Sequence, residues 1–230
     1  MKATPVSDNL IQLNRLGVVN AFLVREDDGF TLVDTTLSGN AGAIVEAAGA
    51  AGLPIVRIAL THAHGDHIGS LDALNAELPD AQVILGAREF RLVEQERRLD
   101  PDEPEAKVRG SWPAFETPPS RTVVEDDRVG SLRVLFTPGH TPGHISFLDE
   151  RDRTVIAGDA LSTLGGVAVA GKLRPLFPLV AMATWHRPTA VQSARKLRAL
   201  DPQRLVVGHG KPLDDPGAAI DRAVQAAGQR

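Results

Sequence analysis

The feature that most constrains this chain is a group of four potential metal ligands within six residues. They lie in the sequence Thr-His-Ala-His-Gly-Asp-His, as His62, His64, Asp66 and His67. A short, mostly apolar run at 56–60 precedes them and a helical pattern at about 70–78 follows them. The ligands therefore lie where a strand ends and a helix begins, and we expect the fold to bring further ligands to this strand end.

The spacing within this group suits two neighbouring ions. In an extended segment, residues i and i+2 project to the same side, so His62 and His64 can hold one ion together. Gly65 then permits a sharp turn of the backbone. Asp66 and His67 lie beyond that turn and can face a second position nearby.

Three further candidates each follow an apolar strand and are flanked by glycine. They are His140 in Thr-Pro-Gly-His-Thr, Asp159 in Ala-Gly-Asp, and His209 in Val-Gly-His-Gly. Imidazole and carboxylate ligands suit Zn²⁺ and also accept iron or manganese. The chain contains no cysteine, which excludes disulfides, thiolate zinc ligands and a cysteine nucleophile.

Short strands alternate with helices along most of the chain. We expect strands at 18–24, 30–33, 56–60, 82–85, 132–136, 145–148, 154–156 and 205–207, and helices at 40–51, 70–78, 87–95, 189–200 and 216–227. Residues 97–121, rich in proline and charge, form an irregular excursion. The order predicts two mixed sheets packed face to face with helices outside, a four-layer αββα sandwich, in a single domain at 1–230.

The ligand pattern resembles that of the metallo-β-lactamase superfamily. Residues 62–67 match its HxHxDH signature, and the glycine-flanked His140, Asp159 and His209 match its remaining motifs in the expected order. The resemblance extends from about Asn20 to His209, and it implies an αββα sandwich with the site at one edge of the two sheets.

By the same resemblance, two ions share the site. The resemblance implies that His62, His64 and His140 hold the first ion, that Asp66, His67 and His209 hold the second, and that Asp159 bridges them. Asp34, in Val-Asp-Thr, resembles an aspartate that orients a ligand in this family. We expect two Zn²⁺ per chain, with iron and manganese as the alternatives.

A metal pair of this kind predicts hydrolysis by a hydroxide shared between the ions, because metal coordination lowers the pKa of water from 15.7 to about 7. Asp66 is the candidate to accept the proton of the nucleophile. Acyl-homoserine lactonases of this superfamily place a tyrosine near the bridging aspartate, but this chain has no tyrosine, and Ser162 is a poor acid. A thiolate, with a pKa of about 8.5, leaves unaided. We therefore expect a small thioester, ester or lactone as the substrate.

Other functions fit parts of the pattern. The net charge of −4 and the lack of a basic patch disfavour a phosphodiesterase or ribonuclease. A mononuclear iron persulfide dioxygenase-like enzyme needs only one metal, and a non-catalytic metal-binding module would not keep seven ligands. Hydrolases of glutathione thioesters carry a basic C-terminal extension, whereas Lys211 is the sole lysine after His209 here.

Two histidines lie outside the ligand set. We expect His144 to be structural or to support the site, and His186 to be a surface residue or a substrate contact. The apolar residues of the segment 161–187 are expected either to fill the core or a dimer contact, or to form an apolar wall for an acyl or aromatic substrate.

In the second case, Arg174 would reach a substrate carboxylate and Phe177 would belong to the wall. Trp112 and Phe115 are candidates to complete it.

No run approaches the roughly 18–20 apolar residues that a membrane span needs. Residues 1–12 lack the basic segment and apolar core of a signal peptide. We therefore expect a cytoplasmic protein with a small-molecule substrate, no nucleic-acid partner and no membrane association. The sequence is compatible with a homodimer as well as with a monomer.

Overall fold

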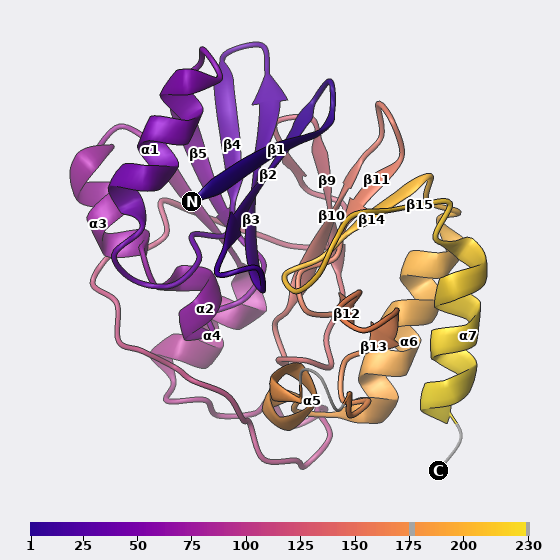
Figure 1. Ribbon diagram of the computed structural model, residues 1–230. Coiled ribbons are helices and arrows are strands. Elements are labelled where there is room, and N and C mark those ends of the chain that lie inside the picture. The colour runs from indigo at the N-terminus through magenta and orange to yellow at the C-terminus, as the bar shows by residue number, and fades with distance from the viewer. Residues whose placement is uncertain (175–177, 229–230) are drawn as a thin grey trace.

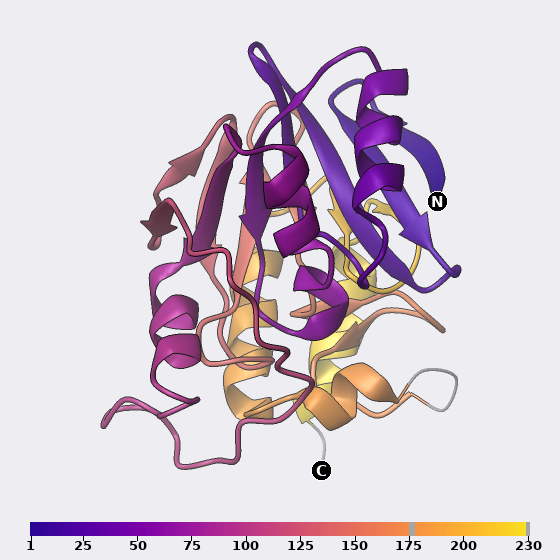
Figure 2. The ribbon, with the colours of Figure 1, turned by 90° about the vertical axis from the view of Figure 1, so that its left-hand side faces the viewer.

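Two mixed β-sheets form the centre of the molecule (Figures 1 and 2). The computed structural model describes residues 1–174 and 178–228. The first sheet has the order β1 (Lys2–Ser7), β2 (Leu10–Arg15), β3 (Val19–Glu26), β4 (Gly29–Val33), β5 (Ile55–Leu60), β6 (Gln82–Gly86) and β7 (Arg121–Val123). The second has the order β15 (Leu213–Asp214), β14 (Arg204–Val206), β11 (Thr154–Ile156), β10 (Ile145–Asp149), β9 (Leu132–Phe136) and β8 (Arg128–Val129). A separate pair joins β12 (Leu161–Ser162) to β13 (Ala168–Val169).

Strand direction is mixed in both sheets. The first sheet begins with antiparallel neighbours and continues with parallel pairing from β4 through β7. In the second sheet only β11 and β14 pair in parallel. Because these two strands run the same way, the residues that follow them emerge at the same edge of the sheet, which matters for the site below.

Helices cover the outer face of each sheet. They are α1 (Ala41–Ala50), α2 (Gly65–Ile68), α3 (Leu71–Glu77) and α4 (Ala87–Glu94) by the first sheet, α6 (Arg187–Ala199) and α7 (Gly217–Gly228) by the second, and a short α5 (Leu179–Ala183) between. In Figure 1, α1 and α3 lie at one side of the molecule, and α6 and α7 lie at the other.

Alternation of side chains along the strands explains the layers. In β3, Phe22 and Val24 pack between the sheets, whereas Ala21 and Leu23 pack toward the helices. Phe147 in β10 meets the same inter-sheet core from the opposite side. Strands buried on both faces need nearly continuous apolar runs, which is what the sequence shows. The four-layer αββα arrangement predicted from the sequence is confirmed.

The main predicted strands and helices are present, with ends shifted by one or two residues. Residues 97–120 contain no helix or strand, which confirms the irregular excursion. The sequence analysis missed the hairpin of β1 and β2, whose first strand is a half-exposed sheet edge without a strong apolar alternation. It also missed the shortest elements, α2, α5, β7, β8, β12, β13 and β15.

No helix among the described residues is both long and apolar enough to cross a bilayer.

Candidate metal centre

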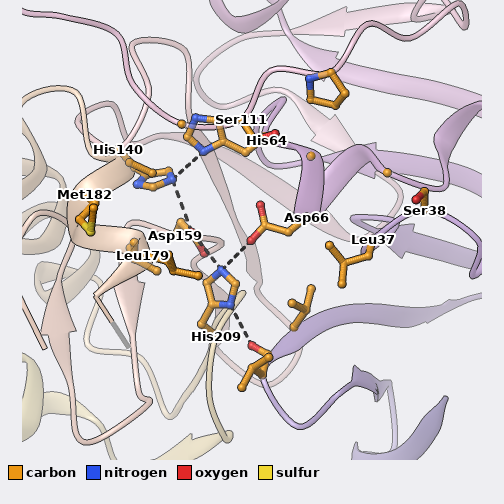
Figure 3. Close-up of a pocket in the computed structure, with 18 of the residues that line it drawn as sticks. Leu37, Ser38, His64, Asp66, Ser111, His140, Asp159, Leu179, Met182 and His209 are labelled. Carbon is orange, nitrogen blue, oxygen red and sulfur yellow. Dashed lines mark hydrogen bonds and ion pairs between the residues drawn. The ribbon is translucent and has the colours of Figure 1, made fainter. Parts of the chain in front are cut away.

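The seven predicted ligands meet at one edge of the two sheets. His62 and His64 follow β5, and α2 carries Asp66 and His67. The other three ligands come from loops of the second sheet. His140 lies between β9 and β10, Asp159 follows β11, and His209 follows β14. The strand ends of both sheets therefore supply one cluster (Figure 3).

The ligand atoms form three overlapping groups, each with all its atoms within 4.8 Å of one another. The groups are His62, His64 and His140; His62, His67 and Asp159; and Asp66, His67 and His209. Asp159 lies between the others: its Oδ2 is 3.4 Å from His140 Nε2 and 3.3 Å from His209 Nε2. The first and third groups have the same membership as the two ion sites expected from the sequence, and the second group places the Asp159 carboxylate between them.

In His62, His64 and His209, one ring nitrogen donates a hydrogen bond and the other is left available to an ion. Thr61 Oγ1 donates to Asp34, so it accepts a hydrogen bond from His62 Nδ1 at 3.0 Å. Backbone carbonyl oxygens accept hydrogen bonds from the other two histidines. His64 Nε2 donates to Arg109 O at 2.9 Å, and His209 Nδ1 donates to Val18 O at 2.8 Å. A ring nitrogen that donates carries the proton, so the opposite nitrogen keeps its lone pair for a metal.

His140 and His67 are held in the same way. Thr184 Oγ1 donates to Val180 O and therefore accepts from His140 Nδ1 at 3.2 Å. His67 Nδ1 donates to Asp34 Oδ2 at 2.7 Å. Among the described residues, His62 Nε2, His67 Nε2 and Asp159 Oδ1 are buried without a hydrogen-bond partner. Buried polar atoms rarely lack partners, and a bound cation would satisfy all three.

Charge in the cluster favours a cation. Burial lowers the pKa of His67, but the carboxylates of Asp159 and Asp34 outweigh burial and hold this pKa well above its ordinary value. Burial likewise opposes protonation of His209, yet Asp159 raises the pKa of His209 to about 10. The carboxylates thus attract positive charge to this point, and a metal ion would take the place of the protons.

Asp34 orients two parts of the cluster, as the sequence analysis proposed. It is buried and adopts a left-handed backbone conformation, with φ 62°. Its carboxylate accepts hydrogen bonds from the Thr61 backbone N–H at 2.8 Å and from His67 Nδ1 at 2.7 Å. One side chain therefore fixes both the end of β5 and the ring of a candidate ligand.

His144 supports Asp159 and has no nitrogen free for an ion. Its Nε2 accepts a hydrogen bond from the Asp159 backbone N–H at 3.1 Å. Its Nδ1 lies 2.9 Å from Thr137 Oγ1. The side chain of His186 bonds elsewhere, because its Nδ1 lies 2.7 Å from Thr189 Oγ1 at the start of α6. The structure therefore supports the structural interpretation of His144 and places the side chain of His186 outside the three ligand groups.

Asn20 is a supporting residue that the sequence analysis missed. Its fully buried side-chain amide donates to Val207 O and to Gly210 O, both at 2.8 Å. These carbonyls flank the loop that carries His209, so a strand of the first sheet holds a ligand loop of the second. A single asparagine inside an apolar strand gives no sequence pattern from which this role could be read.

Glu89 joins two ligand loops and was also missed. It is buried in α4, and its carboxylate accepts hydrogen bonds from Ala63 N at 2.9 Å, Thr141 Oγ1 at 2.7 Å and Gly143 N at 3.1 Å. Ala63 lies between His62 and His64, whereas the other two donors follow His140 within three residues. The three ligands expected to hold the first ion are therefore tied together through one carboxylate.

Replacing Glu89 with glutamine should lower the free energy of unfolding by at least about 2 kcal/mol, because the amide presents N–H groups to buried donors and leaves some unpaired. Chemical denaturation of the chelator-treated protein measures the change. The matched control is Glu94→Gln, an exposed position in the same helix. Equal stability of the two variants would show that the Glu89 network does not hold the loops.

The stability of the wild type and that of Glu89→Gln should depend differently on pH. Burial raises the pKa of Glu89 to about 7, from an ordinary value of 4.5. Between these two pH values the folded protein holds a proton that the unfolded chain has released, so rising pH destabilises the wild type through this group. The stability advantage of the wild type over Glu89→Gln should therefore shrink from pH 4.5 to pH 7. A constant difference would contradict this.

A short strap, which we define as residues 109–114, covers one side of the cluster. Besides the Arg109 carbonyl that holds His64, Ser111 O accepts a hydrogen bond from Gly65 N at 3.0 Å. Gly110 has φ 97°, and a Cβ added there would lie 2.1 Å from His64 Nε2. The ring of Trp112 meets the His64 ring edge-on at a centroid distance of 4.9 Å. The irregular excursion thus positions a candidate ligand.

The cluster forms the floor of a cavity of about 890 Å³. Its walls are largely apolar and come from three places: Val18, Val19 and Leu37 near the first sheet, Pro113 and Ala114 in the strap, and Leu179, Val180 and Met182 in α5. Among the described lining residues, the ionisable side chains are all candidate ligands, and none is lysine or arginine. Figure 3 shows Leu37, Leu179 and Met182 around the cluster.

The segment 161–187 contributes both to the core and to the wall of the cavity. Leu161 and Val169 are buried in the core beneath the second sheet, whereas α5 provides the cavity wall. The expectation for Arg174 was wrong: its guanidinium donates to Val167 O at 2.6 Å instead of facing the site. Phe177 lies outside the described residues.

Trp112 and Phe115 do not line the cavity and pack against the core beneath the first sheet, which corrects that expectation. Their neighbours Pro113 and Ala114 line the cavity instead. Ser162 is likewise unavailable as an acid, because its Oγ donates to His209 O at 3.0 Å.

Comparison with known proteins agrees with the ligand pattern and the fold. Residues 14–209 match the model of the metallo-beta-lactamase superfamily. The uncharacterized protein YobT of Bacillus subtilis is 42% identical over 210 residues, which cover 91% of this chain and 90% of that protein. The probable metallo-hydrolase YflN of the same organism is 31% identical, over 85% of this chain and 82% of YflN.

Two further comparisons bear on chemistry. A hydroxyacylglutathione hydrolase of Cereibacter sphaeroides is 32% identical over 194 residues, covering 82% of this chain but 61% of that enzyme. The crystal structure of TTHA1623 in a di-iron-bound form superposes with a TM-score of 0.67 and 28% identity, over 90% of this chain and 95% of the other.

The fold and the cluster define a metal-dependent hydrolase of the αββα class. This chain belongs to the metallo-β-lactamase superfamily.

Proposed function

We propose that this protein is a dinuclear metal hydrolase that cleaves a small thioester, ester or lactone with an apolar acyl group. The observation that carries the proposal is the arrangement of the five histidines among the seven candidate ligands. Each histidine donates from one ring nitrogen to an oxygen acceptor and turns the other into the cluster, where His64 Nδ1 and His140 Nε2 lie 3.0 Å apart and the Asp159 carboxylate lies beside His67, His140 and His209. Such a donor set fits two cations and has no use in a purely structural polar network.

Bound to these residues, two ions would lower the pKa of coordinated water to about 7 and so supply a nucleophile at neutral pH. We propose Zn²⁺ as the metal, because histidine and carboxylate ligands suit it. The similarity to TTHA1623, whose structure is di-iron-bound, favours iron as the alternative. Metal analysis of the purified protein distinguishes these ions and gives the number per chain.

Asp66 is the residue that we propose to accept a proton during the reaction. It is one-third exposed at the cavity floor, and its Oδ2 lies 3.2 Å from His209 Nε2. Burial opposes ionisation of Asp66, but the neighbouring His67 and His209 hold its pKa well below the ordinary value, so the carboxylate is ionised at neutral pH. Among the described residues its Oδ1 has no hydrogen-bond partner, so this oxygen is free to face the substrate.

The cavity sets the preference for an acyl group. Apolar walls would bind a hydrocarbon chain, whereas a polyanion would meet no lysine or arginine among the described lining residues. With no tyrosine in the chain and Ser162 bonded elsewhere, no strong general acid is available, so a thiolate is the preferred leaving group. A relative named hydroxyacylglutathione hydrolase supports hydrolysis of an acyl compound.

Initial rates on a small panel test the proposal: an acyl thioester, a homoserine lactone, a β-lactam and an aryl phosphodiester. We expect turnover of the thioester or lactone, and its loss in His62→Ala, which excludes a contaminant. In Asp66→Asn the turnover should fall by about 10²–10⁴, the usual worth of a general acid or base. Phosphodiester cleavage alone would overturn the proposed substrate class, and an Asp66→Asn variant with both metals and full turnover would refute the proton role.

A further inference from the structure

A second hollow adjoins the metal cavity on the far side of α5. It measures about 470 Å³ and is lined by Arg109, Arg187, Leu173, Met182, Thr184 and Trp185, together with small neighbours. Met182 lines both spaces, and Arg109 directly precedes Gly110 in the wall of the metal cavity. A molecule seated over the metal cluster could therefore extend across Met182, labelled in Figure 3, into this hollow.

The hollow is positively charged and its charge is not compensated. Neither Arg109 nor Arg187 makes a side-chain hydrogen bond or an ion pair within residues 1–174 and 178–228, and no acidic side chain in those ranges lines the hollow. By contrast, Arg88 and Arg151 are each paired with acidic side chains. Helix α6 begins at Arg187 with no acidic residue in its first turn, so its positive end adds to the two guanidinium groups.

Both residues are exposed, but the stem of Arg187 and the backbone of Arg109 are held in place. The stem of Arg187 lies against Gly171, where an added Cβ would stand 2.5 Å from Arg187 Cγ. The carbonyl of Arg109 accepts hydrogen bonds from His64 Nε2 at 2.9 Å and from Trp112 Nε1 at 2.8 Å. The backbone that carries one cation is therefore fixed relative to a candidate metal ligand, so an anion bound here would have a defined position relative to the reacting centre.

We infer that this hollow binds an anionic group, a carboxylate or a phosphate, at the end of the substrate opposite its apolar acyl group. This inference rests on the proposed function and narrows it to esters and thioesters with an anionic leaving-group portion. Guanidinium groups form paired hydrogen bonds to carboxylate and phosphate oxygens. Trp185 offers an apolar surface for the part of the substrate that lies between its acyl end and its anionic end. The metal cavity has no arginine or lysine among its described lining residues, so the hollow supplies the cationic side chains for this end of the substrate.

A pair of substrates with the same acyl group tests the assignment. They are the butyryl thioesters of mercaptosuccinate, which is dianionic, and of N-acetylcysteamine, which is neutral. In Arg187→Gln and in Arg109→Gln, the ratio of the KM for the anionic substrate to the KM for the neutral one should rise about fivefold, the worth of a partly exposed charge pair. Arg195→Gln removes the same charge from an exposed position in α6 and should leave the ratio as in the wild type.

Direct binding separates this inference from the proposed function. Succinate and inorganic phosphate, each added alone, should change the tryptophan fluorescence of the wild type saturably. The midpoint should rise about fivefold in Arg187→Gln and stay unchanged in Arg195→Gln. If the wild type cleaves no thioester, the proposed function fails while this titration still decides whether the hollow binds anions.

Two results would overturn the assignment. Anion binding that depends on Arg187, together with a KM ratio that does not, would mean that the hollow takes a separate anion and not the substrate. Absence of any dependence on Arg187 in both measurements would mean that the hollow is not an anion site.

Discussion

Replacing Asp159 with asparagine is expected to remove bound metal and to lower turnover by more than about 100-fold. Its carboxylate lies 3.3–3.5 Å from the ring nitrogens of His67, His140 and His209. Asparagine keeps the shape but brings no negative charge and turns N–H groups toward a cation. Loss of a residue that only supports a metal ligand typically lowers metal affinity or activity by about 10–100-fold. About 100-fold is therefore a lower limit for the loss of a ligand shared by two ions.

Metal content by elemental analysis and turnover of the best panel substrate measure this effect together. Asp80→Asn is the control, since it removes the same charge at an exposed position that makes no hydrogen bond or ion pair in the described part of the chain. An Asp159→Asn protein with two ions per chain and the turnover of the control would show that the carboxylate is not shared between ions.

The second large effect is expected far from any ligand in the sequence. Gly110→Ala would place a Cβ 2.1 Å from His64 Nε2 and 2.5 Å from His64 Cε1. The ring would have to move, which breaks its hydrogen bond to the Arg109 carbonyl and turns Nδ1 away from His140. We expect loss of one ion per chain and a fall in turnover of about 10–100-fold, the usual effect of disturbing what orients a ligand.

Backbone strain alone must be separated from this effect. Gly52 has φ 86°, and an added Cβ there meets nothing within 4 Å. Gly52→Ala therefore carries the left-handed strain, of about 1 kcal/mol, without the contact. Retention of both ions in Gly110→Ala, with turnover equal to that of Gly52→Ala, would show that the strap does not position His64.

The candidate ligands could be proposed because most of them are polar side chains at the ends of apolar strands, where little else explains a buried histidine, and Asp66 and His67 follow directly in α2. The layers were predictable for a similar reason, since runs such as Phe22 to Val24 are apolar on both faces and must be covered on both. Asp34 could be proposed from a short motif that resembles a known family pattern.

What the sequence did not reveal depends on distant contacts. Glu89 and Asn20 act on loops many residues away, and the strap acts through a backbone carbonyl whose position no local pattern determines. The direction taken by Arg174 is likewise set by the nearby Val167 carbonyl and not by the polarity of its segment. The two arginines of the second hollow come together only through the packing of the excursion against α5 and α6.

The origin of the ligands in both sheets has a consequence for folding. Each ion would join a ligand from the first sheet to one from the second, closing a long stretch of chain as a disulfide does in other proteins. Such a link is reversible, and binding contributes about 2.7 kcal/mol when the free ion is at 100 times its dissociation constant. In a chain without cysteine, the resistance to unfolding would then follow the supply of metal in its surroundings.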